Sequence, residues 1–196
     1  MLSSEVKQAV VEIRAQAEPV EFSDAFAVLT NLVFAYQVIV ASERLLQEAA
    51  QEASGGLRDY YLTHLEEERD HQAWLAEDLA SFGLDVKSIN PMRHAIAMTG
   101  SQYYLIKHVD PSCLLGYMAV LEGFPVTMEW VEAIEAMHGK PIMRTMRYHA
   151  EADLEHRKAL FDEIDKHEHP GILMNARQTA IYLNQFSHTL NQSLAA

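Results

Sequence analysis

Residues 64–75 read His-Leu-Glu-Glu-Glu-Arg-Asp-His-Gln-Ala-Trp-Leu, and this stretch places ionisable side chains on the apolar face of a predicted helix. At about 100° per residue, positions i, i+3, i+4 and i+7 share one helix face. Glu68 and His71 therefore fall on the face that also carries Tyr61 and Leu75. An unpaired buried charge costs several kcal/mol. The stretch thus predicts polar partners or a metal ion inside a helical core.

Three other predicted helices repeat this pattern of carboxylate or imidazole groups on an apolar face. Glu43 is the one carboxylate on the stripe of the first long helix, and Glu122 follows a strongly apolar run. A later helix carries His149, Asp153 and His156 in the spacing His-x-x-x-Asp-x-x-His. Carboxylates and imidazoles from facing helices are the ligand supply of non-haem di-iron and di-manganese centres. The four segments together predict such a centre.

Residues that end helices divide the chain into about seven helical segments. Gly and Pro clusters such as Ser54-Gly55-Gly56, Asn90-Pro91 and Asp110-Pro111 mark the breaks. Between them apolar residues recur every three or four positions, without the sustained alternation of strands. The expected long helices are 23–53, 56–83, 112–138 and 142–168, and the shorter ones are 3–17, 92–108 and 172–192. The sequence therefore predicts an all-α fold, a single-domain helical bundle over residues 1–196.

Composition narrows the class of protein. The chain has 196 residues, of which 49% are hydrophobic, which suits one compact domain with a sizeable core. Its formal net charge of −13 argues against nucleic acid or an anionic membrane as a partner. The longest apolar run, 114–121, is too short to span a bilayer. A single cysteine excludes an internal disulfide and fits a reducing compartment, so a cytoplasmic protein is expected.

The order of the polar groups resembles two helical families. Glu43, the Glu68/His71 pair, Glu122 and the Asp153/His156 pair follow the order seen in ferritin-like di-iron carboxylate proteins. Over more of the chain, the sequence is similar to the non-haem di-iron oxidases of the haem-oxygenase-like superfamily, relatives of thiaminase II and pyrroloquinoline-quinone synthase. The similar segments are 64–75 with Asp78-Leu and Phe82-Gly83, Gln102-Tyr103-Tyr104, Leu115-Gly116-Tyr117, Leu121-Glu122-Gly123 and the His149 to His156 motif.

The departures from that superfamily also carry information. Thiaminase II relatives use a catalytic Cys near the third core helix, where this chain has Glu122, and Cys113 lies well upstream. Haem oxygenases take an axial His from the first helix, whereas this chain has no His before His64. Neither thiaminase activity nor haem binding is therefore expected. His64 and Glu67 remain alternative metal ligands beside the Glu-x-x-His pair.

The resemblance implies an oxidoreductase with two non-haem Fe (or Mn) ions that uses O2 as co-substrate. The substrate would be a small organic molecule such as a fatty acid, an amino acid or an amine. The implied ligands are Glu43, Glu68 and His71 for one iron and His149, Asp153 and His156 for the other, with Glu122 bridging the two. The expected substrate pocket is lined by Tyr36, Tyr61, Met118 and Met146.

Two other functions compete with this interpretation. One is a ferritin-like iron-binding protein, which would handle Fe(II) without an organic substrate and form larger assemblies. The other is a metal-free helical binding protein of the same fold. The resemblance also allows a homodimer. Metal content separates the metal-free protein from the other two, and assembly size with substrate-dependent O2 uptake separates the oxidase from the iron-binding protein.

Overall fold

A computed structural model describes residues 1–124 and 126–195, with the side chains of all these residues except 152–155. Within these ranges the chain forms nine α-helices and three short 3-10 helices, and no strand. The α-helices are α1 (Leu2–Arg14), α2 (Ala25–Glu52), α3 (Gly55–Glu67), α4 (His71–Ser81), α5 (Arg93–His108), α6 (Leu114–Leu121), α7 (Met128–His138), α8 (Arg144–Ile164) and α9 (Pro170–Leu194). The 3-10 helices are η1 (Val86–Ser88), η2 (Pro111–Cys113) and η3 (Lys140–Met143). The predicted all-α class is confirmed.

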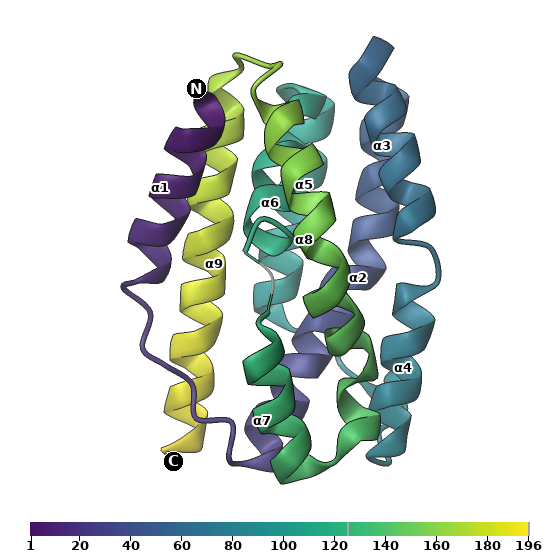
Figure 1. Cartoon of the computed structure of the whole chain (residues 1–196), viewed down its shortest axis with the longest axis vertical. Helices are drawn as coiled ribbons and strands as arrows, with labels where there is room; N and C mark the ends of the chain where they lie inside the picture. Colours follow the sequence, from purple (N-terminus) through teal and green to yellow (C-terminus); the bar gives the residue numbers. More distant parts are fainter. Residues whose placement is uncertain (125, 196) are drawn as a thin grey trace.

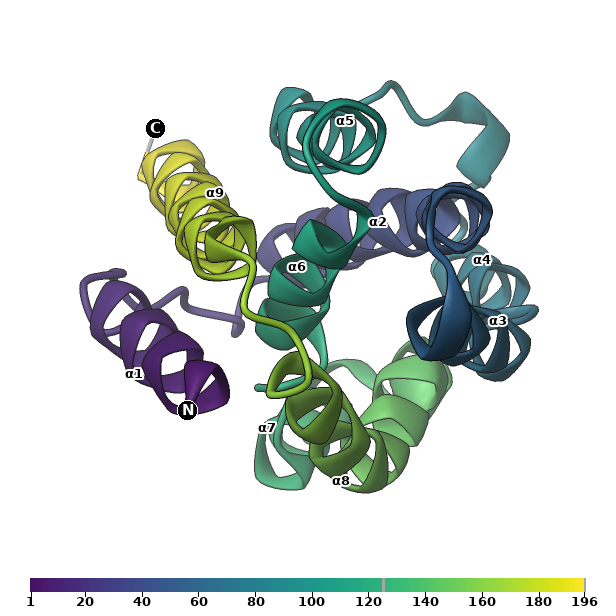
Figure 2. The same cartoon turned by 90° about the horizontal axis from the view of Figure 1, so that it is seen from above.

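The helices run mostly along the long axis of the molecule (Figure 1). Seen from above, α1 and α9 lie on one side of α6, while α3 and α4 lie on the opposite side of the molecule (Figure 2). The helix α2 packs against α3, α4 and α5, and α6 packs against α8 and α9. The fold thus surrounds α6 and the middle of α2 with helices from both ends of the chain.

Two of the predicted long helices are each divided, which corrects the expected number from about seven to nine. The predicted helix 56–83 breaks between α3 and α4, where Asp70 has a left-handed backbone with a φ of 69°. Aspartate tolerates this conformation better than most residues, but nothing in the run of charged helix formers before it signals a break. The predicted helix 112–138 ends at Leu121 and resumes at Met128 as α7.

The break between α6 and α7 has a plainer cause in the sequence. Gly123 and Pro125 follow α6 closely, and proline disfavours helical backbone at the residue before it. Pro125 itself lies outside the described residues. The new helix begins at an N-cap, because the Thr127 side chain accepts a hydrogen bond from the backbone N–H of Trp130 at 3.2 Å. The break leaves Glu122 directly after the last residue of α6.

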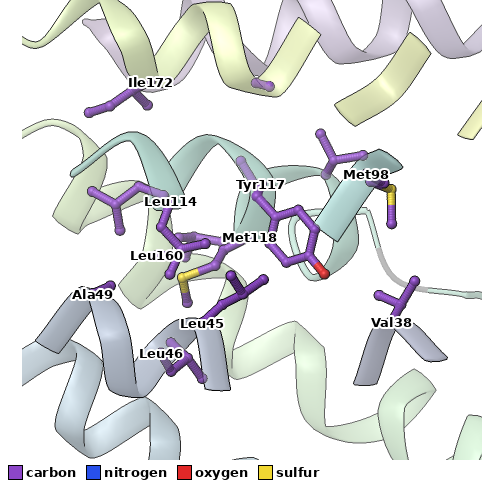
Figure 3. Close-up of a cluster of buried hydrophobic side chains, with 14 of the residues drawn as sticks. Val38, Leu45, Leu46, Ala49, Met98, Leu114, Tyr117, Met118, Leu160 and Ile172 are labelled. Carbon is purple, nitrogen blue, oxygen red and sulfur yellow. The ribbon is translucent and has the colours of Figure 1, made fainter. Parts of the chain in front are cut away.

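The larger of two hydrophobic clusters lies where α2, α6, α8 and α9 meet (Figure 3). Leu45 and Leu46 of α2 pack here with Tyr117 and Met118 of α6, and all four are nearly inaccessible to solvent. A glycine allows the backbones of α6 and α9 to approach closely. A Cβ atom at Gly116 would overlap the carbonyl oxygen of Ile172, so the backbones of these two helices touch at this position.

By length and apolar composition alone, α2 is a candidate membrane-spanning helix, longer than the apolar run 114–121 noted in the sequence. In this structure it lies against three other helices, and part of its apolar face lines a cavity. The length and composition of α2 are weak evidence of a membrane span, because a core helix of a soluble protein or a signal sequence passes the same test.

Candidate metal centre

A buried carboxylate fixes the helix that carries the His149 motif. Asp78 of α4 accepts a hydrogen bond from the backbone N–H of Thr145 at 2.7 Å, and its other oxygen lies 3.3 Å from Nε of Arg144. These contacts hold the N-terminus of α8 against α4, since a carboxylate satisfies the free N–H groups and the positive end of a helix. About one turn further along α8, His149 reaches His71, the first residue of α4.

Glu68, His71 and His149 form the first cluster of candidate ligands. One ligand atom from each residue lies within 4.8 Å of the others. Nδ1 of His71 is 3.1 Å from Oε2 of Glu68, and the His71 and His149 rings are 4.9 Å apart and nearly perpendicular. His71 is 1% exposed, and its Nε2 has no hydrogen-bond partner among the described residues. A metal ion would satisfy this buried nitrogen.

His64, Glu67, Glu122 and His156 form a second cluster beside the first. Nε2 of His64 lies 3.0 Å from Oε2 of Glu122, and its Nδ1 lies 3.3 Å from Oε2 of Glu67. Nε2 of His156 is 3.9 Å from the same oxygen of Glu67. Three helices therefore meet here: α3 with His64 and Glu67, the end of α6 with Glu122, and α8 with His156. Both alternative ligands considered from the sequence, His64 and Glu67, belong to this cluster.

The carboxylates and imidazoles of the two clusters shift one another's pKa values, within each cluster and between the two. Burial lowers the pKa of His64, but the charge of Glu122 and of the nearby Glu68 and Glu67 outweighs burial and raises this pKa to about 9. Burial raises the pKa of Glu68, but the contact with His71 and the charge of the neighbouring imidazoles outweigh burial and lower it. Carboxylates thus stabilise protons on imidazoles in the metal-free protein, and a bound cation would replace those protons.

The structure groups the predicted ligands differently from the sequence analysis. His149 lies with Glu68 and His71, although it was expected to share an ion with His156. Seven residues separate the two histidines, which is about 10 Å along a helix, so each faces a different cluster. Glu43 is in neither cluster. Its Oε2 accepts a hydrogen bond from Gln72 at 3.3 Å, and its buried Oε1 has no hydrogen-bond partner among the described residues.

Asp153, the remaining predicted ligand, lies on α8 between His149 and His156, and its side chain is outside the described residues.

A cavity of about 320 Å³ opens beside the two clusters. His64, Glu68, Glu122 and His149 all line it, together with Met118 and Met146, as expected for the last two. The two tyrosines expected in the wall, Tyr36 and Tyr61, are not among the described residues that line the cavity. Tyr61 is fully buried and donates a hydrogen bond from its hydroxyl to the carbonyl of Pro111 at 2.8 Å. Tyr36 packs against the smaller hydrophobic cluster.

Aromatic rings beside the first cluster were not identified from the sequence. The rings of Trp74 and Tyr148 lie 4.6 Å and 5.1 Å from the ring of His71, and they lie 5.2 Å from each other. Tyr148 directly precedes His149, and Trp74 follows His71 by three residues. These positions close to candidate ligands were the sequence feature that could have identified the two aromatic residues.

Cys113 does not have the surroundings of an activated nucleophile. Its side chain is buried, and burial together with the charge of Asp110 raises its pKa to about 11. Sγ lies 3.7 Å from Nδ1 of His169, and that nitrogen also accepts a hydrogen bond from the backbone N–H of Gly171. A thiol with a raised pKa is a poor nucleophile at neutral pH.

Comparisons with known proteins identify the fold. No protein-family model and no curated protein sequence matches the chain. A domain of unknown function with a haem oxygenase-like fold from Shewanella denitrificans superimposes with a TM-score of 0.75 at 13% identity, over 99% of this chain and 89% of that one. A TenA homologue from Pseudomonas syringae superimposes with a TM-score of 0.77 at 12% identity, over 96% of this chain and 92% of that one. The chain therefore has the haem oxygenase-like fold expected from its sequence.

Proposed function

We propose that this protein is an O2-dependent non-haem di-iron oxidoreductase that acts on a small organic substrate. The observation that carries the proposal is the set of Glu68, His71 and His149, of which the first two are buried and the third is half-buried. Two imidazoles and one carboxylate with open positions are the ligand set of non-haem Fe(II) oxygenases. The polar atoms of this set are buried in a fold where an apolar core would be more stable, so a bound cation explains their presence.

The second ion would be held by the second cluster. His64, Glu122 and His156 offer two imidazoles and a carboxylate, with Glu67 within reach of both histidines. Asp153 stays a proposed ligand of this ion because its sequence position is between the two ligand histidines of α8. Manganese suits the same mixture of ligands.

Bound iron would supply the activation of O2. The chain's own residues bind the ions, exclude water and present the substrate. Glu68, Glu122 and His149 each lie on the wall of the cavity, so both clusters adjoin the space that a substrate would fill. The lining is otherwise mostly apolar, with Met118 and Met146 near the clusters. The site therefore favours a substrate with a hydrocarbon part over a strongly polar one.

Metal content after anaerobic loading with Fe(II) tests the proposal. Mass spectrometry of the wild-type protein should find two irons per chain, and the double variant His71→Ala/His149→Ala should lose at least one of them. His188→Ala is the matched control, because His188 is exposed on α9 and bonds only to Gln192 among the described residues. Circular dichroism would show whether the double variant keeps its helical content.

Other outcomes would identify the competing functions. Two irons per chain with rapid Fe(II) oxidation, no effect of any organic substrate on O2 uptake, and a large assembly would favour a ferritin-like iron-binding protein. No stoichiometric iron or manganese in the wild type would overturn the proposal. It would leave a metal-free helical binding protein, whose buried polar groups are satisfied by ion pairs such as His64–Glu122.

A further inference from the structure

The cavity has a cationic end as well as an acidic one. Arg14, the last residue of α1, lines the same cavity as His64 and Glu68. We propose that the cavity binds an amphiphilic organic anion, with its charged group on Arg14 and its hydrocarbon part extending toward the two clusters of candidate metal ligands. The role of this anion as the substrate of a di-iron centre rests on the proposed function, whereas the binding of the anion to the cavity does not.

One face of α2 forms an apolar wall between the two ends. The lining residues of this helix recur at helical spacing over sixteen positions, which corresponds to about 22 Å of helix. They are Asn31, Phe34, Ala35, Val38, Ile39, Ser42, Leu45 and Leu46. Across from this face, Tyr117 and Met118 of α6 line the cavity near Leu45 and Leu46 (Figure 3). A wall of this kind fits an extended hydrocarbon chain.

Arg14 lacks a counter-ion in the part of the chain that the structure describes. Its Nη1 donates one hydrogen bond, of 2.6 Å, to Oδ1 of Asn184, and no carboxylate among the described residues forms an ion pair with it. Asn184 is itself held by a hydrogen bond to the carbonyl of Ile13. Burial lowers the pKa of Arg14 from its ordinary value. A partly desolvated guanidinium with most of its five donors unused is suited to bind an anionic group.

The cationic and acidic lining residues come from helices on opposite sides of α6. Figure 2 shows α1, which ends at Arg14, on one side of α6, and α3 and α4 on the other. His64 lies on α3, Glu68 directly follows α3, and His71 begins α4. In the metal-free protein the carboxylates of Glu68 and Glu122 outnumber the protonated imidazole of His64 at their end of the cavity, whereas Arg14 is the one permanently charged cation among the described lining residues. The orientation follows from this asymmetry: the charged group binds near α1, and the hydrocarbon end faces the ligand clusters.

Calorimetric titration of the metal-free, full-length protein tests this inference. The ligands are decanoate, decanesulfonate, decanol and decyltrimethylammonium, each below its micellar concentration. Decanoate and decanesulfonate should bind more tightly than decanol, and decyltrimethylammonium should bind least. Arg14→Gln should weaken decanoate roughly 10- to 100-fold and leave decanol nearly unchanged, since a hydrogen bond to a charged group is lost. Arg14→Lys should keep most of the preference for the anion.

Arg177→Gln is the matched control, because Arg177 is exposed on α9 and is not among the residues lining the cavity. The inference is overturned if decanol binds as tightly as decanoate, if Arg14→Gln weakens both equally, or if none of the four compounds binds. The iron content of Arg14→Gln after Fe(II) loading distinguishes failure of the anion-binding inference from failure of the proposed di-iron function. Full iron content with no anion preference would refute only the inference, and anion binding without iron would refute only the di-iron proposal.

Discussion

Replacing Asp78 should reveal how strongly the N-terminus of α8 is held. Asp78 is 2% exposed and accepts the Thr145 N–H bond at 2.7 Å, and Asp78→Ala removes this acceptor. A hydrogen bond to a charged group contributes about 1.5–3 kcal/mol, and a carboxylate at a helix N-terminus adds about 0.3–1 kcal/mol. The contact with Arg144 adds little, because that guanidinium is 56% exposed. We therefore expect a loss of roughly 2–4 kcal/mol.

Glu77 provides the control for this experiment. It forms an ion pair with the same arginine at 2.8 Å, but its side chain is 68% exposed and it is not bonded to the start of α8. Glu77→Ala should therefore cost less than about 1 kcal/mol. For a chain of this length 1 kcal/mol corresponds to about 2–4 °C in Tm, so Asp78→Ala should lower Tm by about 4–16 °C. Calorimetry of the metal-free variants measures both changes, and equal shifts would refute the helix-capping argument.

Four further expectations concern other parts of the fold. Gly116→Ala should destabilise the protein by about 1–3 kcal/mol or more in chemical denaturation, because the added Cβ would overlap the Ile172 carbonyl. Gly100→Ala, in open space on a helix, should stabilise it by up to about 1 kcal/mol. Tyr61→Phe removes the hydrogen bond to the Pro111 carbonyl and should cost about 1 kcal/mol of stability without changing decanoate affinity. A change in that affinity would show that Tyr61 does line the cavity. Cys113 should react with a thiol reagent only after unfolding, and rapid labelling of the native protein would contradict its burial.

The helix boundaries were largely predictable because the sequence marks them with local chemistry. Asp110 followed by Pro111 predicts a capped start, and the Asp110 side chain does accept the Ser112 N–H bond at 2.8 Å. The divisions inside two predicted helices were not found. At Asp70 the left-handed backbone follows a run of good helix formers, so tertiary contacts around His71 outweigh local propensity there.

The chemistry of the site could be predicted more fully than its geometry. Helical periodicity identified Glu68, His71 and His149 as polar residues on apolar faces, and the structure brings them together. Periodicity assigns a face but not a depth along the axis, which is why His149 and His156 were grouped although they are two turns apart. Arg14 gave no signal at all, since an arginine in the last turn of a helix is ordinary. The role of Arg14 depends on which cavity the end of α1 reaches, and this depends on the tertiary structure.

Both helix breaks lie directly beside carboxylates of the candidate site. Glu68 follows the last residue of α3, and Glu122 follows the last residue of α6. No further turn of the same helix follows a side chain at the helix end, so its carboxylate can turn toward a neighbouring helix. Each of these two glutamates contacts a histidine, Glu68 the first residue of the following helix and Glu122 the more distant His64. Departures from local propensity concentrate at functional sites, and the break at Asp70, which the local sequence does not signal, is such a departure directly beside Glu68 and His71.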